Sequence, residues 1–485
     1  MALQILPSKK TKIVCTIGPA SQSQEVLTKL IQKGMNIARI NFAHGDFDSH
    51  RQTIANVRAA AAMAGERVAI FGDLPGPKMR IGRLEEEPIE LESGQPFILQ
   101  TEEILGNHKR VSMDFAGLPQ AVKMGDRIYM NDGYIQLRVE QVVNDAVHCT
   151  VRMGGELRSH KGVNFPGIDL GIDVFTDHDH KMLAFAAEQE LDAVSQSFVS
   201  TAADIEAVRT AAAELDYDPL IIAKIERAGA LPNLEAIVAA ADGIMVARGD
   251  LGVEIPIEEI PFTQKQIILA ANMAGKPVIT ATQMLESMTT NRRPTRAEVT
   301  DVANAILDGT DCVMLSGETA VGQFPIDTVS TMSRIAAAIE TSVDSEDLGI
   351  LDLLRLQRAA NEISIDDLIS YSVFRTAERL RPQIVIVPSR SGATARRITR
   401  FRLPQWVLAP SMRVTSCQRL QFSYGVLPIF VPAEELDWDR FSRQLPAHFG
   451  LHTGLAMLVE GAGTLDFNDT KRIDIIQLNP KGKDE

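Results

Sequence analysis

The chain has 485 residues, of which 45% are hydrophobic and 23% are charged, and its formal net charge is −14. This length predicts more than one hydrophobic core, and the composition is that of a soluble globular protein. The acidic balance argues against general nucleic-acid binding, because few cations are left over to neutralise phosphates. An anionic substrate would need cations concentrated at one place.

The cysteines and the first residues favour a cytoplasmic protein. The four cysteines are far apart and form no CxxC pair, which argues against structural zinc and against a disulfide framework. The first residues, MALQILPSKKTK, have too short an apolar run for a signal peptide, and no run of 18 apolar residues follows. We therefore expect no membrane segment.

Eight short apolar runs, each followed by a stretch with helical periodicity, predict a parallel (β/α)₈ TIM barrel. Each run becomes polar at its C-terminal end, where barrel enzymes carry their chemistry. We assign residues 1–73 and 171–345 to this catalytic domain. The runs are 12–18, 36–42, 68–74, 193–199, 220–226, 243–250, 277–282 and 312–317.

The connection between the third and fourth runs is too long for an ordinary βα loop. It contains alternating runs at 127–129, 135–139 and 147–152, with turn signals at Asn131–Gly133 and Gly154–Gly155. Residues 74–170 are therefore predicted to form an inserted small β domain. A lid over the active-site end is the functional interpretation, and a passive insertion is the alternative.

The pattern changes again after an acidic stretch at 344–354. New strand candidates follow at 384–387, 426–431, 456–459 and 473–477. We assign residues 346–485 to a C-terminal α/β domain with an open doubly wound sheet.

The ends of the fifth and sixth runs carry candidate metal and phosphate groups. Lys224 and Glu226 are two residues apart and so project to one side of a strand, while Ile221, Ala223 and Ile225 face the other side. They could form a plain interior ion pair, or a lysine for a phosphoryl group beside a carboxylate for Mg²⁺. Asp250 at the next strand end would supply the second carboxylate, and Gly249 would let backbone amides approach an anion.

The seventh and eighth runs end in hydroxyl residues. Thr280 and Thr282 are expected on one face, with Thr282 where the next helix begins. A hydroxyl at this place caps a helix by default, although it can also hold a substrate carboxylate. Ser316, at the end of the eighth run, is equally ambiguous.

Basic side chains cluster near the second and third runs. Arg39 and Asn41 share one strand face, His44 follows them, and Lys78 and Arg80 lie just after the third run. With Lys224, these residues would give an acidic protein a local basic focus. Phosphoryl transfer needs mainly such positioning and cations around the moving charge.

At this point the sequence resembles the pyruvate kinase family. The resemblance covers the barrel almost completely, the insertion moderately and the C-terminal domain in outline, and a signature of this length is specific. The segments that carry it are KIVCTIGPAS (12–21), GMNIARINFAHG (34–45), KGVNFPG (161–167), IIAKIE (221–226), DGIMVARGDLGVEIP (242–256), GKPVITATQMLESM (275–288), RPTRAEVTDVANAILDG (293–309) and MLSGETAVGQFP (314–325).

The resemblance implies a phosphotransferase that converts phosphoenolpyruvate and ADP to pyruvate and ATP. It implies that Glu226 and Asp250 hold Mg²⁺, with a second Mg²⁺ arriving with ADP; Mn²⁺ suits the same carboxylates. The remaining implied roles are Lys224 and Arg39 at the transferring phosphoryl group, Gly249, Asp250 and Thr282 at the substrate carboxylate, Asn41, His44, Arg80 and Lys161 at the nucleotide, and Thr282 and Ser316 in protonation of enolpyruvate.

Departures from the family pattern bear on K⁺. Where members need K⁺, oxygens at the equivalents of Asn41, Ala43, Asp73 and Leu74 hold it, and Ala43 and Leu74 lack a side-chain oxygen. The family's nearby glutamate is Lys78 here, as in members that work without K⁺. We expect the Lys78 ammonium to replace the ion and the enzyme to be K⁺-independent; neutral drift is the alternative. Ser200 replaces a family arginine, and the sequence offers no physical account of it.

Two further expectations come from the resemblance. The Ser/Gly-rich turn formed by Ser389, Arg390, Ser391, Gly392 and Thr394 resembles the family loop that binds the phosphate of a regulatory sugar phosphate, although an ordinary helix cap is nearly as good an interpretation. The segment 293–309 opens with a capping box at Thr295 and Glu298 and lies at a subunit contact in the family, so a homotetramer is expected.

Two other functions stay open. A metal-dependent carbon–carbon lyase acting on phosphoenolpyruvate or pyruvate would share the carboxylate pair but would not need the insertion, Lys224 or Arg39. A non-catalytic regulatory homologue would explain Ala43 and Leu74 as decay. All the residues assigned to metal, phosphoryl and carboxylate binding are nevertheless present.

Overall fold

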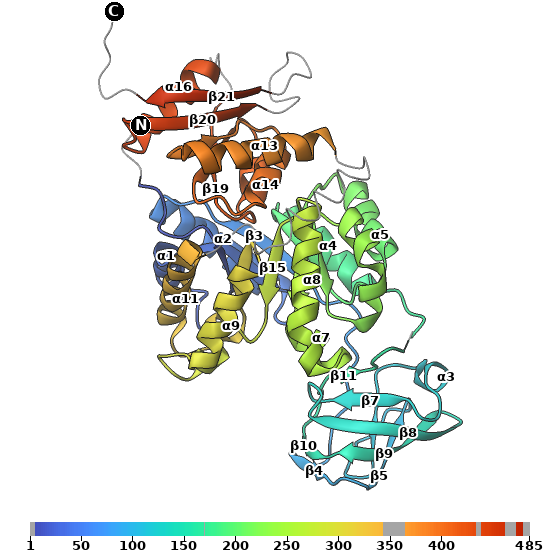
Figure 1. Ribbon diagram of the computed structural model, residues 1–485. Coiled ribbons are helices and arrows are strands. Elements are labelled where there is room, and N and C mark those ends of the chain that lie inside the picture. Colours follow the sequence, from blue (N-terminus) through green and yellow to red (C-terminus); the bar gives the residue numbers. More distant parts are fainter. Residues whose placement is uncertain (1–4, 169, 343–363, 433–437, 461–471, 479–485) are drawn as a thin grey trace, which may run out of the picture.

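The structure is a computed structural model that describes residues 5–168, 170–342, 364–432, 438–460 and 472–478. Its centre is a closed eight-stranded parallel barrel, as the sequence predicted (Figure 1). Around the barrel the strand order is β1-β16-β15-β14-β13-β12-β3-β2. The strands are β1 (Lys12–Thr16), β2 (Met35–Asn41), β3 (Ala69–Leu74), β12 (Ala193–Gln196), β13 (Leu220–Ile225), β14 (Gly243–Ala247), β15 (Val278–Ala281) and β16 (Cys312–Leu315).

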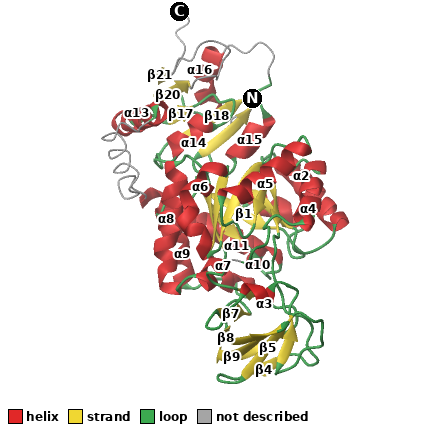
Figure 2. Ribbon diagram, turned by 90° about the vertical axis from the view of Figure 1, so that its right-hand side faces the viewer, coloured by secondary structure: helices red, strands yellow, loops and turns green. Residues whose placement is uncertain are grey.

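Helices surround this barrel on the outside (Figure 2). Several start at the capping signals in the sequence: Thr295 and Glu298 form the predicted capping box, in which the Thr295 hydroxyl accepts a hydrogen bond from the Glu298 amide at 3.2 Å. The helices of the barrel are α1 (Gln24–Gln32), α2 (Phe47–Ala64), α4 (Asp177–Glu188), α5 (Ala202–Glu214), α6 (Leu234–Ala240), α7 (Arg248–Glu254), α8 (Ile260–Met273), α9 (Arg296–Leu307), α10 (Gly317–Ala320) and α11 (Pro325–Ile339), with 3₁₀ turns η1 (Ala228–Asn233), η2 (Ile257–Glu259), η3 (Glu286–Thr289) and η4 (Glu340–Ser342).

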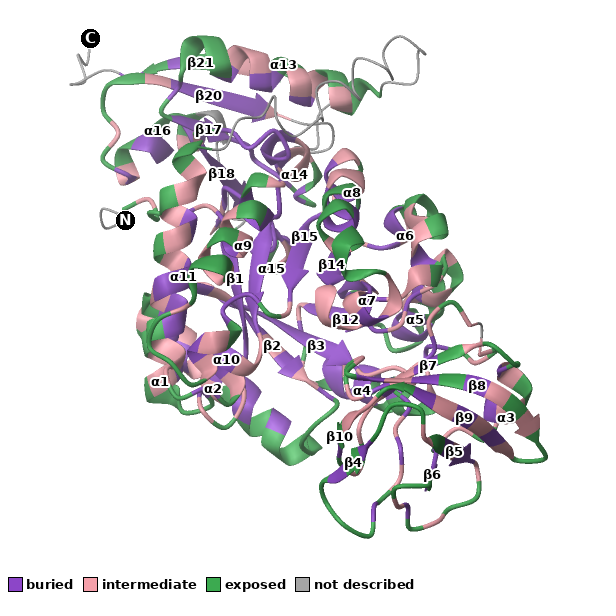
Figure 3. Ribbon diagram, turned by 60° about the horizontal axis from the view of Figure 1, so that its bottom comes forward, coloured by how far each residue is buried: buried purple, intermediate pink, exposed green. Residues whose placement is uncertain are grey.

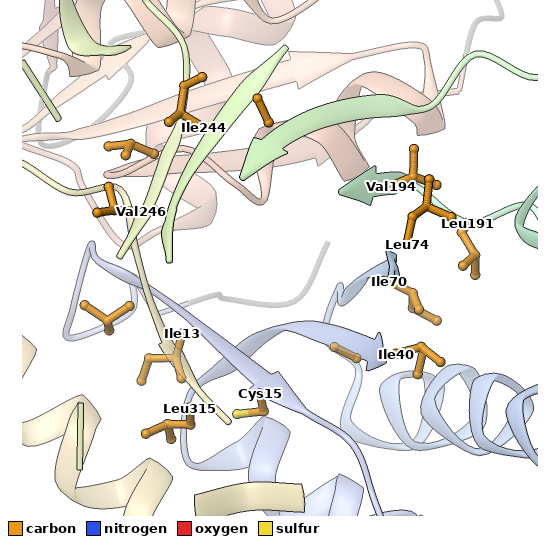
Figure 4. Close-up of a cluster of buried hydrophobic side chains, with 14 of the residues drawn as sticks. Ile13, Cys15, Ile40, Ile70, Leu74, Leu191, Val194, Ile244, Val246 and Leu315 are labelled. Carbon is orange, nitrogen blue, oxygen red and sulfur yellow. The ribbon is translucent and has the colours of Figure 1, made fainter. Parts of the chain in front are cut away.

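The strand side chains divide between two cores because they alternate in direction. In β13, Leu220 and Ile222 face the barrel interior, whereas Ile221, Ala223 and Ile225 pack against the helices. This alternation is the predicted one, and it directs Lys224 inward. Figure 4 shows part of the outer core, including Ile13, Cys15 and Leu315 from adjacent strands, and Figure 3 shows how completely the barrel strands are buried.

A β domain is inserted after β3. Its six-stranded sheet has the order β11-β7-β8-β9-β5-β6, and β4 pairs with β10 beside it. The predicted turn joins β7 to β8, with Asn131, Asp132 and Gly133 all at positive φ, as a tight hairpin requires. The elements are β4 (Ile89–Leu91), β5 (Pro96–Gln100), β6 (Arg110–Ser112), α3 (Leu118–Ala121), β7 (Arg127–Met130), β8 (Ile135–Val143), β9 (Ala146–Met153), β10 (Gly155–Leu157) and β11 (Val163–Asn164).

The C-terminal part contains a five-stranded sheet of order β19-β18-β17-β20-β21, in which only β20 and β21 are antiparallel. The predicted α/β class is correct, but β18 was not predicted, and the acidic stretch at 344–354 lies outside the described residues. The elements are α13 (Ile365–Leu380), β17 (Ile384–Ile386), α14 (Ala393–Thr399), β18 (Trp406–Ser411), α15 (Val414–Leu420), β19 (Val426–Phe430), α16 (Trp438–His448), β20 (Gly454–Glu460) and β21 (Arg472–Leu478).

The two added domains lie at opposite ends of the barrel (Figure 1). The inserted β domain is beyond the C-terminal ends of the strands, and the C-terminal domain covers their N-terminal ends. Phe422 of the C-terminal domain is fully buried within the inner barrel core, where its ring centroid lies 6.1 Å from that of Phe71. Within the described residues, none of the helices combines the length and apolarity needed to cross a membrane.

Two local predictions at the strand ends are wrong. The run 243–250 was expected to be strand throughout, but β14 ends at Ala247 and α7 begins at Arg248. Thr280 and Thr282 do not share a face. The Thr280 hydroxyl donates a hydrogen bond to the Thr310 hydroxyl on the outer side of the barrel, whereas Thr282 follows the end of β15 and has a positive φ of 68°. The next regular helix begins only at Arg296, so Thr282 is not its cap.

Candidate active site

Arg39, Asp73 and Lys224 form the buried centre of the site at the C-terminal end of the barrel. Asp73 Oδ2 accepts hydrogen bonds from Arg39 Nε at 3.1 Å and from Nη2, while Asp73 Oδ1 lies 3.4 Å from Lys224 Nζ. Ser195 donates a further hydrogen bond to Oδ1 at 2.6 Å. One carboxylate therefore orients two cations that come from different strands.

The electrostatics of this centre follow from burial and pairing. Burial by itself would raise the pKa of Asp73, but the charges of Lys224 and Arg39 lower it to about 2. Burial would likewise lower the pKa of Lys224, and Asp73 and Glu226 instead raise it above its ordinary value. Lys224 and Asp73 thus hold each other in their charged forms.

Glu226 completes this group immediately after β13. Its Oε1 accepts the Phe198 amide at 2.7 Å, and its Oε2 lies 3.4 Å from Lys224 Nζ. Within the described residues Oε2 is buried without a hydrogen-bond partner, and burial raises the pKa of this carboxyl group. Such an oxygen is available to a cation that enters the site.

Asp250 lies at the edge of the same group, in the first turn of α7. Its Oδ1 is 3.7 Å from Lys78 Nζ, which reaches over from the start of the inserted domain. Asp250 also acts electrostatically on both Lys224 and Glu226. The structure thus places Glu226 in contact with Lys224, and Asp250 close enough to influence both. Within the described residues, no group of three His, Cys, Asp or Glu side chains could hold a metal ion.

Thr282 and Gly249 join the ends of two neighbouring strands. The Thr282 hydroxyl accepts the Gly249 amide at 2.8 Å, and Thr282 has φ 68°, an uncommon conformation for a β-branched residue. The nearly buried Arg248 stabilises this turn, because its Nη2 donates to the Thr282 carbonyl at 2.7 Å and its Nη1 to Asp301 at 2.7 Å. Backbone strain of this kind is concentrated at functional sites.

Ser316 lies after β16, and its buried Oγ has no hydrogen-bond partner among the described residues. The carboxylate of Glu318, itself fully buried, accepts the Ser316 amide at 2.7 Å and the Leu285 amide at 3.0 Å. Glu318 therefore ties the loops after β15 and β16 together.

The predicted nucleotide residues come from two places. Asn41 and His44 follow β2 in the barrel, and the Asn41 side chain accepts the Ala43 amide at 3.2 Å. Arg80 and Lys161 lie in the inserted domain. The backbone of Arg80 forms an antiparallel β-bridge with Gly162, and Arg80 Nη1 donates a hydrogen bond to the His160 carbonyl at 3.0 Å. A cleft of about 1150 Å³ lies between this domain and the barrel, between residues such as Tyr129 and Gly249, and none of the four predicted nucleotide residues lines it.

The predicted effector loop lies in the C-terminal domain, at the other end of the barrel. Its turn is held by its own side chains: the Ser389 hydroxyl accepts the Gly392 amide at 2.8 Å, and Ser391 accepts the Ala393 amide at 3.4 Å. Gly392 has φ 82°, and a Cβ there would come 2.7 Å from Leu420.

Sequence reasoning did not assign roles to Arg248, Ser195, Ser197 or Glu318. Ser197 accepts a hydrogen bond from Lys224 Nζ at 2.6 Å and donates one to the Leu74 carbonyl at 2.7 Å. Arg248 directly precedes Gly249 and Asp250, so its position at a strand end was the available signal. The two serines carried no such signal, because their contacts join separate strands. Ser200 accepts Asn233 Nδ2 through its carbonyl and receives no clearer role from its contacts.

A (β/α)₈ barrel with paired cations and carboxylates at its strand ends, beneath an inserted β domain, defines a barrel enzyme suited to anionic substrates. The comparisons specify the family. The family model described as "Pyruvate kinase, barrel domain" matches residues 8–329, and "Pyruvate kinase, alpha/beta domain" matches residues 367–456. The chain belongs to the pyruvate kinase family and is an enzyme of the phosphotransferase class.

Individual relatives agree with this assignment. The chain is 45% identical over 479 residues to a pyruvate kinase of Thermococcus litoralis, covering 99% of this chain and 97% of that one. It is 43% identical over 421 residues to one of Geobacillus stearothermophilus, covering 86% and 71%. A crystal structure of a pyruvate kinase from Cryptosporidium parvum superposes with a TM-score of 0.89 at 36% identity, covering 97% and 96%.

Proposed function

We propose that this chain transfers the phosphoryl group of phosphoenolpyruvate to ADP, giving pyruvate and ATP, at the site around Lys224. The observation that carries the proposal is the position of the Lys224 ammonium, which lies 3.4 Å from both Asp73 and Glu226. The Oε2 atom of Glu226 beside it has no hydrogen-bond partner in the described structure and is available to a metal ion. This arrangement lies at the C-terminal end of the barrel, within the residues 8–329 that the family model matches.

Lys224 and Arg39 bind the phosphoryl group and stabilise its charge during transfer. Their cations are already desolvated and are oriented by Asp73, so little reorganisation is needed when the charge moves. Phosphoryl transfer requires little covalent chemistry from the protein. Positioning of the reactants and electrostatic stabilisation supply most of the catalysis.

Glu226 and Asp250 fit Mg²⁺. Both are hard oxygen donors, Glu226 Oε2 is buried without a hydrogen-bond partner in the described structure, and two carboxylates leave the other coordination positions to water and substrate oxygens. Bound there, Mg²⁺ would neutralise charge on the phosphoryl and carboxylate oxygens of the substrate. Mn²⁺ fits the same donors. The second Mg²⁺ would be held by ADP.

Gly249, Asp250 and Thr282 orient the carboxylate end of phosphoenolpyruvate. The Thr282 hydroxyl already meets the Gly249 amide, so this pair forms one surface that the Arg248 contacts hold in place. Asn41 and His44 on the barrel, with Arg80 and Lys161 on the inserted domain, bind the nucleotide phosphates.

Ser316 and Thr282 take part in protonating enolpyruvate through water. The buried Ser316 hydroxyl makes no protein hydrogen bond in the described structure, so it can both accept from and donate to a water molecule. Closure of residues 74–170 over the site would exclude bulk water and limit hydrolysis of the phosphoryl donor.

Lys78 replaces the monovalent cation, and the enzyme works without K⁺. Lys78 Nζ lies 3.7 Å from Asp250 Oδ1, so a fixed positive charge already stands beside a proposed metal ligand. Ala43 and Leu74 supply no side-chain oxygen for an ion. These two facts support K⁺ independence together.

The remaining parts of the proposal concern regulation and assembly. A phosphorylated effector would bind at the loop formed by residues 389–394, and four subunits would assemble, with the segment 293–309 at a subunit contact. The enzyme would act in glycolysis in the cytoplasm. Light scattering at the mass of a monomer would contradict the tetramer, and loss of activation by every phosphorylated sugar and nucleotide would contradict the effector site.

The test is pyruvate formation from phosphoenolpyruvate, ADP and Mg²⁺, coupled to lactate dehydrogenase. Activity that requires both substrates is expected. Folded protein that stays inactive with Mg²⁺ or Mn²⁺, with and without K⁺ and phosphorylated sugars, would point to a regulatory homologue. Metal-dependent cleavage or formation of a carbon–carbon bond with pyruvate, without ADP, would instead indicate the lyase.

A further inference from the structure

The chain leaves the inserted domain through a tight turn just after β11. The Ile168 amide donates a hydrogen bond to the Phe165 carbonyl at 3.1 Å and closes this turn. Pro166 and Gly167 occupy its two central positions, and Gly167 has φ 72°, as the third residue of a type II turn requires. The sequence thus specifies a defined backbone geometry at the point where the inserted domain returns to the barrel.

Two side chains of the barrel hold the backbone of this turn. Arg227 Nη2 donates a hydrogen bond to the Ile168 carbonyl at 3.1 Å. The carboxylate of Glu254 accepts a hydrogen bond from the Gly167 amide. Because both contacts are made to backbone atoms, they fix the path of the chain itself.

The same two side chains are also linked to each other. Glu254 Oε2 accepts the Ala228 amide at 3.4 Å, and Ala228 directly follows Arg227. Burial and the charge of Asp250 raise the pKa of Glu254, whereas the charge of Arg227 and the amides of Ala228 and Gly167 lower it. Arg227, Glu254 and the turn therefore form one set of contacts, which we call the exit clamp.

The exit clamp adjoins both proposed metal ligands. Arg227 directly follows Glu226 in the chain. Glu254 lies four residues after Asp250 in α7, about one helical turn away, so these two carboxylates project on the same side of the helix. The turn is thus held by the two segments that carry the metal carboxylates.

The inserted domain approaches α7 at two other points. In the turn between β7 and β8, a Cβ on Gly133 would come 3.4 Å from Val253, and Lys78 Nζ at the entry to the domain lies 3.7 Å from Asp250 Oδ1. Figure 1 shows α7 facing this domain beside β11. The cleft of about 1150 Å³ borders the exit turn and Glu254, so the domain has room to approach the barrel.

We propose that Arg227 and Glu254 are positioning residues, which through the exit clamp fix the point about which the inserted domain closes over the site. This inference rests on the proposed function, because it assigns both residues to the same reaction. They act through Arg80 and Lys161, which the inserted domain carries to the nucleotide phosphates. Without the clamp, these two cations would meet ADP in a less defined position, and binding of ADP would weaken.

Hydrogen exchange of the full chain without substrates tests the clamp directly. In Arg227→Ala and in Glu254→Ala, the amides of Gly167 and Ile168 should exchange about three- to tenfold faster than in the natural protein. This is the factor expected for the loss of one hydrogen bond of ordinary net strength. Unchanged exchange in both variants would overturn the proposal.

Arg209→Ala is the matched control for this experiment. Arg209 Nη2 also donates to a backbone carbonyl, that of Ala240 at 2.7 Å, but it joins α5 to α6 in the helical layer of the barrel. Its replacement should leave the exchange of Gly167 and Ile168 unchanged. Equally fast exchange of these amides in Arg209→Ala would show a general loosening of the fold and would overturn the clamp.

The coupled pyruvate assay tests the consequence for the reaction. In Arg227→Ala the KM for ADP should rise about three- to tenfold, whereas the KM for phosphoenolpyruvate, whose proposed ligands lie on the barrel, should change by about twofold at most. Arg227→Lys keeps a donor for the Ile168 carbonyl and should recover at least about half of the change. Equal rises in both KM values, with a higher Mg²⁺ requirement, would mean that Arg227 acts on Glu226 and would contradict the clamp.

The two experiments separate this inference from the proposed function. A natural protein that forms no pyruvate would refute the proposed function. The exchange of Gly167 and Ile168 would still decide the clamp, because that measurement needs neither substrate nor activity. An active natural enzyme with unchanged exchange in the variants would refute the clamp alone.

Discussion

Asp73 Oδ2 accepts hydrogen bonds from both Nε and Nη2 of Arg39, so the guanidinium is held against one carboxylate oxygen. The other oxygen of Asp73 faces Lys224. Residues from β2, β3 and β13 are therefore locked into one charged cluster, although 185 positions separate Arg39 from Lys224 in the sequence.

Replacing Lys224 should remove catalysis. In Lys224→Met, the moving phosphoryl charge loses one of the two side-chain cations proposed to stabilise it, and kcat should fall by about 10²–10³ or more. The coupled pyruvate assay measures this loss, and circular dichroism checks folding. Lys29→Met is the matched control, because Lys29 forms an exposed pair with Glu25 on α1. A Lys224→Met enzyme with nearly normal kcat would contradict the role of Lys224.

Asp73 should contribute to stability in a pH-dependent way. Its pKa is about 2 in the folded protein and about 4 in an unfolded chain, so its contribution is fully present above pH 4 and is lost as pH falls towards 2. This difference corresponds to about 2 kcal/mol in favour of the folded state. Denaturant unfolding of Asp73→Asn should show a loss of about that size at pH 7 and a smaller loss near pH 3.

The matched control for this experiment is Asp48→Asn, because Asp48 is exposed on the surface beside Arg51. Its unfolding free energy should change little at either pH. An Asp73→Asn protein as stable as the natural one at pH 7 would show that the cluster does not depend on this carboxylate.

Glu226 should make metal activation depend on pH. Burial raises the pKa of Glu226, so protons compete with Mg²⁺ for the carboxylate more strongly as pH falls. At limiting Mg²⁺, activity should increase with pH, and saturating Mg²⁺ should move that increase to lower pH. Glu226→Gln should raise the Mg²⁺ concentration needed for half activation by at least about tenfold. A pH profile unaffected by the Mg²⁺ concentration would argue against Glu226 as a ligand.

Lys78 should decide the response to K⁺. The natural enzyme should be equally active with K⁺ and with tetramethylammonium. Lys78→Gln should lose activity without recovery by K⁺, because Ala43 and Leu74 offer no side-chain oxygen. The triple variant Ala43→Ser, Leu74→Thr, Lys78→Glu should regain activity only with K⁺. Strong K⁺ activation of the natural enzyme would instead show that the ion finds other ligands.

Phe422 should stabilise the barrel through the C-terminal domain. Its ring is fully buried inside the barrel core beside Phe71, so Phe422→Ala should lower the unfolding free energy by about 3–5 kcal/mol. Phe430→Ala is the control, because the Phe430 side chain is partly exposed at 39%. A small loss in Phe422→Ala would mean that the barrel closes its end without the C-terminal domain.

The sequence alone was enough to predict the parallel barrel, the β insertion and the C-terminal α/β domain. Apolar runs of period two and the capping box at Thr295 are local signals, and each depends on residues that are neighbours in the chain. The same periodicity correctly directed Lys224 towards the interior and Ile221, Ala223 and Ile225 outwards. The domain boundaries and the residue roles stay predictions.

Only the tertiary structure decided how the strand ends meet. The positive φ of Thr282, its bond to Gly249 and the support from Arg248 depend on contacts between separate strands, which no local pattern encodes. The insertion of Phe422 into the barrel likewise joins residues that are 351 positions apart, Phe71 and Phe422. Periodicity specifies which face of an element is apolar, whereas the contacts of a polar side chain depend on which elements closure of the barrel brings together.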